Sequence, residues 1–361
     1  MAIELSDIIF TNRADVVPAS GVEEIINTAI SNTLAGNDRI TGSGGRYSIF
    51  NVGTLNTADG NDIITGIRSQ NEPLDELGAG IRNEGGTIET GRGNDIIEGI
   101  HNRNQIQDSF GGYGIDNERG TIDTGDGNDI VTGINQKIGG VGISSLYGIL
   151  NTGNGNDIIT GIGRVGIVNV ETAFNTGNGN DTITGNSVNE AGLGILNQLE
   201  TMDTGDGNDI ITGTGSVAIA NTIGSTIDTG DGNDLISAIG IRDGIENYGT
   251  INTGKGNDSI IADGGNGGDF VGSGNVFLGN GQDYLKGSGN GNFNGGNGQD
   301  ILELTSGSYT IEISETTINF TGYNNFWGIS IMKTSEFEKL IAGSTTYDFT
   351  SLTNGQTIFV S

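Results

Sequence analysis

Several residue types that often define a protein's chemistry are scarce in this chain. It contains no cysteine, so it can form neither a disulfide framework nor a thiolate metal site. No apolar run approaches the roughly 18 residues of a membrane-spanning helix. The N-terminus, MAIELSDIIF, lacks the basic region and apolar run of a secretory signal peptide. Only 15 residues are basic against 45 acidic ones, and this net charge of −30 argues against nucleic acid and anionic lipid as partners and favours cations.

Glycine, in contrast, is abundant, with 67 residues against two prolines. The glycines recur in a turn of the form Gly-x-Gly-Asn-Asp, or its Gln variant, which follows a looser first copy. Eleven acids end these turns: Asp38, Asp62, Asp95, Asp129, Asp157, Asp181, Asp209, Asp234, Asp258, Asp283 and Asp300. From Asp38 to Asp283, successive acids lie between 24 residues (Asp38 to Asp62) and 34 residues (Asp95 to Asp129) apart.

A repeat at this period indicates a solenoid, in which each unit needs its neighbours to bury a core. We therefore expect an all-β fold, a right-handed parallel β-solenoid (β-roll or β-helix) of about ten coils, with small β caps. The coils should be 24–34 residues long and shorter at the C-terminal end, where the step from Asp283 to Asp300 is 17 residues. The expected organisation is an N-terminal cap at 1–32, solenoid repeats at 33–304 and a C-terminal segment at 305–361.

Three strand patterns recur within each coil. The first follows the turn acid, as in Asp157-Ile-Ile-Thr-Gly-Ile, and a loop of variable length comes after it. A second strand contains Gly-Ile-x-Asn, and a third contains Thr-Ile-x-Thr and leads into the next turn. β-branched residues at equivalent positions suit a buried pleated surface. The repeated asparagines of the second strand should form an internal amide ladder at a bend; they are Asn83, Asn117, Asn169, Asn197, Asn221 and Asn247.

The turn residues are suited to a hard cation. Glycine permits positive φ and close backbone approach, which directs carbonyl oxygens inward, and the aspartate adds an anionic oxygen. Oxygen ligands without Cys or His favour Ca²⁺ over Zn²⁺ or Cu²⁺. Coils stacked about 4.8 Å apart would place the acids in a like-charge column, so we expect folding to depend on the cation. The alternative is a metal-free solenoid with Asn/Asp turns.

The candidate metal ligands are the eleven turn acids, Asp269, and backbone oxygens of the turn residues. The glycines are Gly60, Gly93, Gly127, Gly155, Gly179, Gly207, Gly232 and Gly256, and the asparagines are Asn61, Asn94, Asn128, Asn156, Asn180, Asn208, Asn233 and Asn257. The residue between the glycines includes Arg92 and Lys255. We therefore expect that side chain to face water.

The turns resemble those of the RTX, or haemolysin-type calcium-binding repeat, proteins. Gly264-Gly-Asn-Gly-Gly-Asp269 and Gly295-Gly-Asn-Gly-Gln-Asp300-Ile-Leu match the family's nonapeptide GGxGxDxUx, and the other turns replace its first glycine. The resemblance covers residues 33–304 and implies a parallel β-roll that folds on binding several Ca²⁺ ions. It also implies that each turn aspartate binds an ion shared with the neighbouring turn. The coils here are longer than the family's and carry one calcium turn, so we expect Ca²⁺ mainly along one edge.

Residues 305–361 have less glycine and more alternating apolar residues. They resemble the C-terminal segment of type I secreted RTX proteins, which implies export through secretion machinery and an extracellular location. A cap on the open solenoid end is compatible with the same pattern. Within this segment we expect a short helix around 337–341.

No catalytic constellation is evident, and we expect a non-enzymatic structural or cell-surface adhesive protein. His101, the only histidine, is expected in a solvated loop. One candidate binding patch comprises the long loops 68–79, 101–113 and 135–141, which should stack and bring basic and aromatic side chains together for a surface glycan or a protein. An alternative is a polysaccharide-acting β-helix enzyme or glycan-binding module using the patch 68–147. A second alternative is an ice-binding solenoid, which would need a flat threonine array, whereas threonine concentrates beside the turns.

Overall fold

The computed structural model describes residues 2–18, 23–68, 77–102, 111–136, 139–265, 268–324 and 328–361, which form β-strands almost throughout. The helices among these residues are two single 3₁₀ turns, Leu5–Asp7 and Phe349–Ser351. No helix of this part of the chain is long and apolar enough to cross a membrane. The chain divides into two compact units, Met1–Leu196 and Asn197–Ser361.

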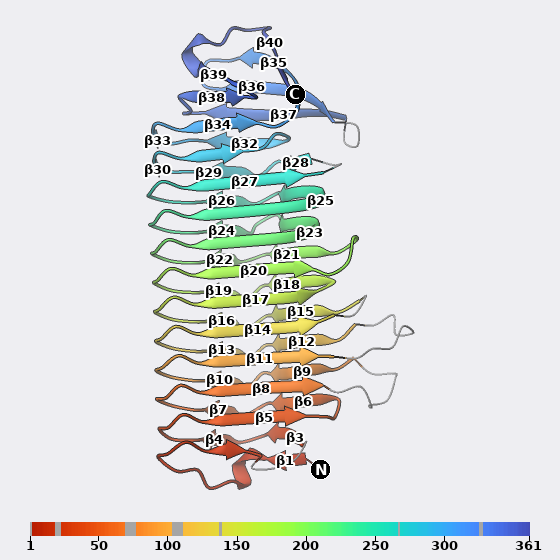
Figure 1. Ribbon diagram of the computed structural model, residues 1–361, viewed down its shortest axis with the longest axis vertical. Coiled ribbons are helices and arrows are strands. Elements are labelled where there is room, and N and C mark those ends of the chain that lie inside the picture. The colour runs from red at the N-terminus through yellow and green to blue at the C-terminus, as the bar shows by residue number, and fades with distance from the viewer. Residues whose placement is uncertain are drawn as a thin grey trace. The chain divides into compact units, whose positions relative to one another are not determined.

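The first unit is a stack of three-stranded coils (Figure 1). The first strand of each coil follows a turn aspartate, and these strands pair in parallel with equivalent residues opposite one another. They are β5 (Arg39–Ser43), β8 (Ile63–Arg68), β11 (Ile96–His101), β14 (Ile130–Asn135), β17 (Ile158–Gly163) and β20 (Thr182–Ser187). The parallel β-solenoid expected from the repeat is confirmed.

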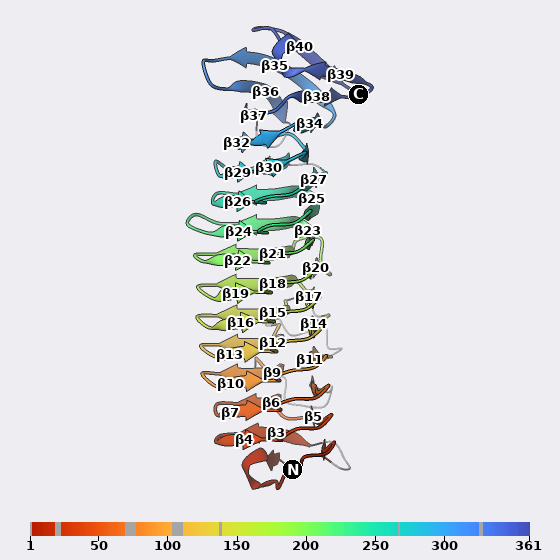
Figure 2. The ribbon, with the colours of Figure 1, turned by 90° about the vertical axis from the view of Figure 1, so that its left-hand side faces the viewer.

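The second and third strands complete each coil and form parallel stacks of their own (Figure 2). The second strands are β6 (Tyr47–Asn51), β9 (Ala79–Glu84), β12 (Tyr113–Glu118), β15 (Val141–Leu146) and β18 (Val165–Val170). The third strands are β7 (Thr54–Asn56), β10 (Thr87–Glu89), β13 (Thr121–Asp123), β16 (Ile149–Asn151) and β19 (Ala173–Asn175).

The core of this unit is a set of stacked columns, because each strand directs an apolar side chain inward. In one coil these are Ile97, Ile115 and Ile122, each at most 1% exposed. β-branched side chains suit this pleated, buried surface, and fully burying one such side chain stabilises the fold by about 1.5–3 kcal/mol. A narrow core of this kind explains how a chain with only 33% hydrophobic residues can fold.

The N-terminal residues also contribute strands to the stack. Strands β1 (Ala2–Glu4) and β2 (Val16–Val17) pair in parallel with β3 (Glu24–Asn27) and β5. Strands β3 and β4 (Ile30–Asn32) pair in parallel with β6 and β7. The segment expected as a cap therefore already has coil pairing from Glu24 onwards.

The outer face of the first strands has a regular pattern that differs from our expectation. One outward column holds Thr65, Glu98, Thr132, Thr160 and Thr184 in register. Isoleucines flank it on both sides in β8, β11, β14 and β17, so threonine is not confined to the neighbourhood of the turns. The expectation overlooked that the repeated Ile-Ile-Thr-Gly-Ile places its threonine outward, since every second residue of a strand faces the same side.

The second unit follows the same plan with shorter connections. The first and second strands merge in β23 (Ile210–Asn221) and β25 (Leu235–Asn247), which pair in parallel with one register shift. Next come β27 (Ser259–Gly264), β28 (Gly268–Val271), β31 (Tyr284–Lys286) and β34 (Ile301–Leu304). The third strands are β22 (Thr201–Asp203), β24 (Thr226–Asp228), β26 (Thr250–Asn252), β29 (Asn275–Phe277) and β32 (Gly291–Asn294).

The C-terminal residues of this unit form an antiparallel layer on the last coil. Strands β35 (Gly307–Ile313), β36 (Ile318–Asn324) and β37 (Gly328–Ser335) are antiparallel neighbours, and β40 (Thr357–Val360) pairs with β35. Strands β37 and β38 (Lys339–Ala342) continue the parallel sheets of β32 and β34, and β39 (Thr345–Asp348) pairs antiparallel with β38. The helix expected around 337–341 is wrong, because Leu340 and Ala342 alternate inward along an extended strand.

Candidate metal centre

The glycine turns of successive coils stack directly on one another. Gly91 and Gly93 have φ of 91° and 141°, values that favour glycine. A side chain added at Gly93 would place its Cβ 1.5 Å from the carbonyl oxygen of Gly60 in the previous coil, and one added at Gly127 would meet Gly93 at the same distance. The turn glycines are therefore required by close stacking as well as by φ.

The turn aspartates form a ladder along this edge. The backbone N–H of Asp38 donates to Oδ1 of Asp62 at 2.7 Å, and that of Asp62 donates to Oδ1 of Asp95 at 2.7 Å. The pattern continues at 2.8 Å from Asp95 to Asp129, from Asp129 to Asp157 and from Asp157 to Asp181. In the second unit it runs from Asp209 through Asp234, Asp258 and Asp283 to Asp300 at 2.8–2.9 Å.

The second carboxylate oxygen lacks such a partner. In nine of these aspartates Oδ2 is buried and accepts no hydrogen bond: Asp38, Asp62, Asp95, Asp129, Asp157, Asp234, Asp258, Asp283 and Asp300. A buried charged acceptor without a partner costs several kcal/mol. Its repetition at these nine aspartates points to a ligand along the column rather than to a local packing defect.

Burial raises the pKa of several of these carboxyl groups. It brings the pKa of Asp62, Asp129 and Asp258 to about 7, although a backbone N–H and a threonine hydroxyl partly offset it. Burial likewise raises the pKa of Asp157, Asp234 and Asp283 to about 6. Charges about 4.8 Å apart repel by roughly 1 kcal/mol in water and roughly 3 kcal/mol at an effective dielectric constant of 20. At neutral pH the metal-free column is therefore poorly stabilised.

A buried threonine column lies beside the aspartates. The hydroxyl of Thr90 donates to the carbonyl oxygen of Thr124 in the next coil at 3.0 Å, and Thr124 donates to Thr152 at 3.2 Å. These threonines are fully buried. They were not among the residues expected at the site, although the recurring Thr-Gly-x-Gly-Asn-Asp could have indicated them.

The turn asparagines expected near the metal direct their side chains outward. Oδ1 of Asn61 accepts the N–H of Asn94 at 2.8 Å, and Oδ1 of Asn94 accepts that of Asn128 at 2.9 Å. The residues between the glycines also face water: Arg92 and Lys255 are exposed and lie beside Asp126 and Asp231, as expected. The turn asparagines and glycines can therefore contribute only their backbone oxygens as candidate metal ligands.

The donor set suits a hard cation. It consists of Asp carboxylate, backbone carbonyl and threonine hydroxyl oxygens, which Ca²⁺ accepts in flexible geometry. Within the described residues no three His, Cys, Asp or Glu side chains gather around one point. A cation in the column would therefore take one carboxylate from each coil and complete its shell with carbonyl oxygens.

Asp269 lies apart from this column. Its Oδ1 accepts the N–H of Gly264 at 3.0 Å, and its Oδ2 accepts the N–H of Ser288 at 2.8 Å and the hydroxyl of Thr305 at 2.5 Å. Both oxygens are thus used in closing the C-terminal coils. At the end of the column, Oε2 of Glu338 accepts the N–H of Asp300 at 2.7 Å, so a glutamate from the C-terminal segment takes the position of the next turn aspartate.

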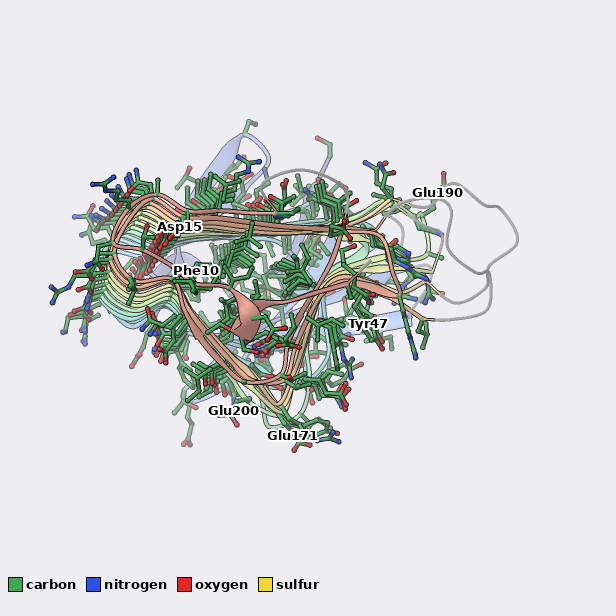
Figure 3. The ribbon with its side chains drawn as sticks, turned by 90° about the horizontal axis from the view of Figure 1, so that it is seen from below. Phe10, Asp15, Tyr47, Glu171, Glu190 and Glu200 are labelled. Carbon is green, nitrogen blue, oxygen red and sulfur yellow. The ribbon has the colours of Figure 1, made fainter. Side chains whose placement is uncertain are left out.

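The expected amide ladder is confirmed at the opposite corner, which Glu171 marks in Figure 3. Nδ2 of Asn83 donates to Oδ1 of Asn117 at 2.8 Å and to the carbonyl oxygen of Thr121 at 3.0 Å. Nδ2 of Asn221 makes the equivalent bonds to Asn247 and Thr250 at 2.9 Å in the second unit. The ladder satisfies backbone carbonyls without a metal.

The loop patch falls mostly outside the described residues, but two of its members are strand residues. Arg68 and His101 are 1% exposed and stack inside the coil, where Nη1 of Arg68 lies 3.0 Å from Nε2 of His101. Nδ2 of Asn135 lies 3.0 Å from the other ring nitrogen. The expectation of a solvated histidine is wrong, because the first strand extends far enough to turn position 101 inward.

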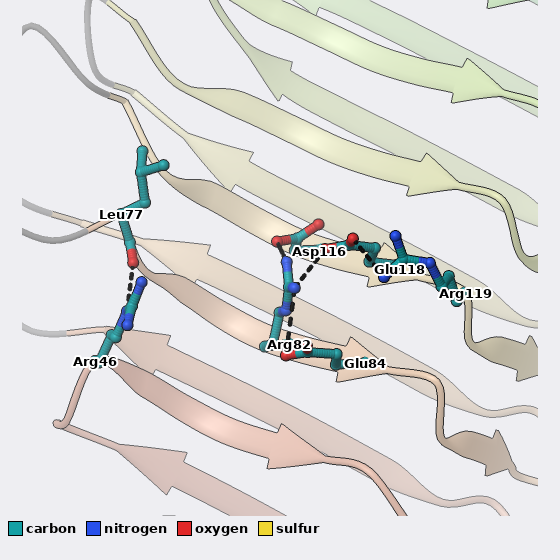
Figure 4. Close-up of polar contacts among 7 residues, drawn as sticks. All are labelled: Arg46, Leu77, Arg82, Glu84, Asp116, Glu118 and Arg119. Atoms are coloured by element: carbon teal, nitrogen blue, oxygen red, sulfur yellow. Dashed lines mark hydrogen bonds and ion pairs between the residues drawn. The ribbon is translucent and has the colours of Figure 1, made fainter.

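The second-strand face carries an ion-pair cluster (Figure 4). Arg82 pairs with Asp116, with Glu118, and with Glu84 at 3.3 Å. Burial raises the pKa of Asp116 to about 6, and the charge of Arg82 opposes this shift. Because Arg82 is engaged by three acids, the cluster is suited to holding coils together.

No family model matches the chain, and no curated protein matches it. Among solved structures it is similar to a hyperactive, Ca²⁺-dependent, β-helical antifreeze protein from an Antarctic bacterium. That likeness has 18% sequence identity and a TM-score of 0.34, and it covers 82% of this chain and 78% of that one. The interpretation of the site therefore rests on its own geometry.

Proposed function

We propose that this chain is a calcium-binding solenoid of the RTX type that folds when Ca²⁺ occupies the turn column. The observation that carries the proposal is the buried, unpartnered Oδ2 of nine stacked aspartates. A divalent cation between coils would neutralise two like charges and supply each Oδ2 with a partner. Binding energy would then become folding energy.

The test is a calcium titration of chelated protein, followed by circular dichroism and calorimetry. We expect a cooperative gain of β signal with Ca²⁺ and little with Mg²⁺, which gives up its water reluctantly. The double variant Asp129→Ala/Asp157→Ala should need more Ca²⁺ to fold. The control Asp126→Ala/Asn154→Ala alters the exposed positions of the same turns and should titrate like the parent chain. A fully folded chain in excess chelator would refute the proposal.

We further propose that the protein is secreted, non-catalytic and structural or adhesive. The support is the C-terminal resemblance to type I export segments and a repeat in which every coil has the same residue chemistry. In a strain with a type I exporter, deleting residues 348–361 should leave the protein inside the cell while calcium-induced folding persists. If export continues and only stability falls, the segment is a cap alone.

A further inference from the structure

The outer face of the first strands in the first unit is a regular surface with almost no charge. We call the outward side chains of β8, β11, β14, β17 and β20 the Ile–Thr face. Its two isoleucine columns run from β8 to β17 and include Ile130 and Ile134, the equivalent positions of β20 hold Thr182 and Asn186, and the threonine column between them includes Thr132. Most of these side chains are half-buried by their neighbours in the stack; Ile158 is 43% exposed, whereas Thr65 is buried at 5%.

Charge separates this face from the other sides of the same unit. Across the five strands its outward columns hold one charged residue, Glu98. The third strands present Glu89 and Asp123, and the second strands present Glu84 and Glu118. On a chain of net charge −30, two copies repel each other through most of their surface. The Ile–Thr face is where they can approach at the lowest electrostatic cost.

We propose that the Ile–Thr face is a self-association surface through which two copies of this chain pair face to face. Five strands about 4.8 Å apart and six residues long offer about 500 Å² per copy, or about 1,000 Å² in the pair. That is near the lower limit of a specific interface, so the pair should be reversible. Sheets pack face to face with interdigitating side chains about 10 Å apart. Isoleucine columns on either side of shorter threonines provide the ridges and groove that such packing requires.

A two-fold pair uses the same patch on both copies, so one substitution acts twice. Thr132→Lys/Thr160→Lys would place four cations in the pair and should shift the protein to monomer. The matched control Thr87→Lys/Thr121→Lys adds the same charge on third strands β10 and β13 and should leave association unchanged. Glu98→Thr, which completes the threonine column, should strengthen association several-fold, because it removes two buried acids from the pair.

The measurement is sedimentation velocity of the full chain across a dilution series, with circular dichroism to compare the fold of each variant. We expect a species of twice the chain mass that dissociates on dilution and is strengthened by salt, which screens the net repulsion. A folded monomer at all concentrations, or equal behaviour of the two lysine variants, overturns the proposal. It is equally overturned if the folded protein stays monomeric, arrests ice recrystallisation and loses that effect in Thr132→Lys/Thr160→Lys, because the face then binds ice. The assay reads mass, so its failure leaves the calcium proposal standing.

Discussion

Two corners of each three-stranded coil bury a ladder of short polar side chains, and they differ in whether the ladder is complete. At the corner occupied by Asn83 and Asn117, each amide both donates and accepts, so one coil satisfies the next. At the glycine edge, the ionised carboxylates of Asp62 and Asp95 can only accept, and one oxygen of each has no hydrogen-bond partner. An asparagine ladder closes on itself, whereas an aspartate ladder needs a cation.

The backbone conformation also differs between the amide corner and the glycine edge. The amide corner turns through single residues with positive φ, and most of these are not glycine: Arg119, Tyr147 and Glu171 have φ of 56°, 58° and 47°. At the glycine edge the second glycine of the turn, such as Gly93, cannot accept a side chain, because its Cβ would meet the carbonyl oxygen of the previous coil. The two corners can therefore also be compared by the cost of adding a side chain at a glycine of each.

The largest effect should come from adding a methyl group at the glycine edge. In Gly93→Ala the new Cβ would lie 1.5 Å from backbone oxygen, so the turn cannot stack without moving. We expect a loss of more than about 4 kcal/mol in urea unfolding with Ca²⁺ present. The control is Gly85→Ala at the amide corner, where φ is 67° and nothing lies within 4 Å of the added Cβ. It should cost only about 1 kcal/mol of backbone strain. Equal costs would contradict the close stacking of the turns.

The next largest effect should follow from making the amide corner resemble the glycine edge. Asn83→Asp removes the donors to Asn117 and Thr121 and buries a charge among carbonyl oxygens. We expect a loss of about 3–5 kcal/mol of unfolding free energy that added Ca²⁺ does not restore. Asn83→Ala should cost less, about 1–3 kcal/mol. Recovery of Asn83→Asp by Ca²⁺ would show that the corner can also hold a cation.

The reverse exchange, from aspartate to asparagine at the glycine edge, should stabilise the protein without calcium and destabilise it with calcium. Asp62→Asn keeps an acceptor for the N–H of Asp38 and removes a buried charge from the column. In chelator, we expect the residual fold to gain about 1 kcal/mol, whereas with Ca²⁺ it should lose about 2 kcal/mol, because a ligand charge is gone. Thermal melts in both conditions measure the two effects. Asp59→Asn, on the exposed side of the same turn, should change neither melt.

The smallest effect per site should be the pH dependence of the metal-free protein. Six of the turn acids have folded pKa values of about 6 to 7, above the ordinary value of 3.8, because burial disfavours the charged form: Asp62, Asp129, Asp157, Asp234, Asp258 and Asp283. The folded state therefore holds more protons than the unfolded state between about pH 4 and 7. Metal-free stability should fall as pH rises through this window, by at most about 1.4 kcal/mol per pH unit for each group. Circular dichroism of the chelated chain at several pH values measures this: the residual β signal should grow as the pH falls, and a signal that grows as the pH rises would contradict the assigned burial.

Much of this architecture follows from local rules that the sequence displays. The recurring Gly-x-Gly-Asn-Asp and its spacing predicted parallel coils, an acid column and an amide ladder, because stacking places equivalent residues one above the other. The outward direction of Arg92 and Lys255 followed from their charge. These features depend only on position within a coil, which the repeat makes visible.

Where one coil ends and a different structure begins, the sequence repeat no longer predicts which residues contact one another. Asp269 matches the turn motif, yet Gly264, Ser288 and Thr305 engage it where the coils shorten. Glu338 lies in no turn motif, yet it ends the aspartate ladder at Asp300. Both roles arise from contacts between segments far apart in the chain.

The sequence by itself determined the coil, its column of acids and the need for a partner at each acid. Tertiary structure decided which side chains face inward at strand ends, as for Arg68 and His101, and which strand face stays free of charge. It also decided that residues 337–341 extend as a strand, because pairing with β34 offers hydrogen bonds and burial that a short helix could not obtain alone. Local sequence sets the repeat, and its boundaries depend on the neighbours that each segment meets in space.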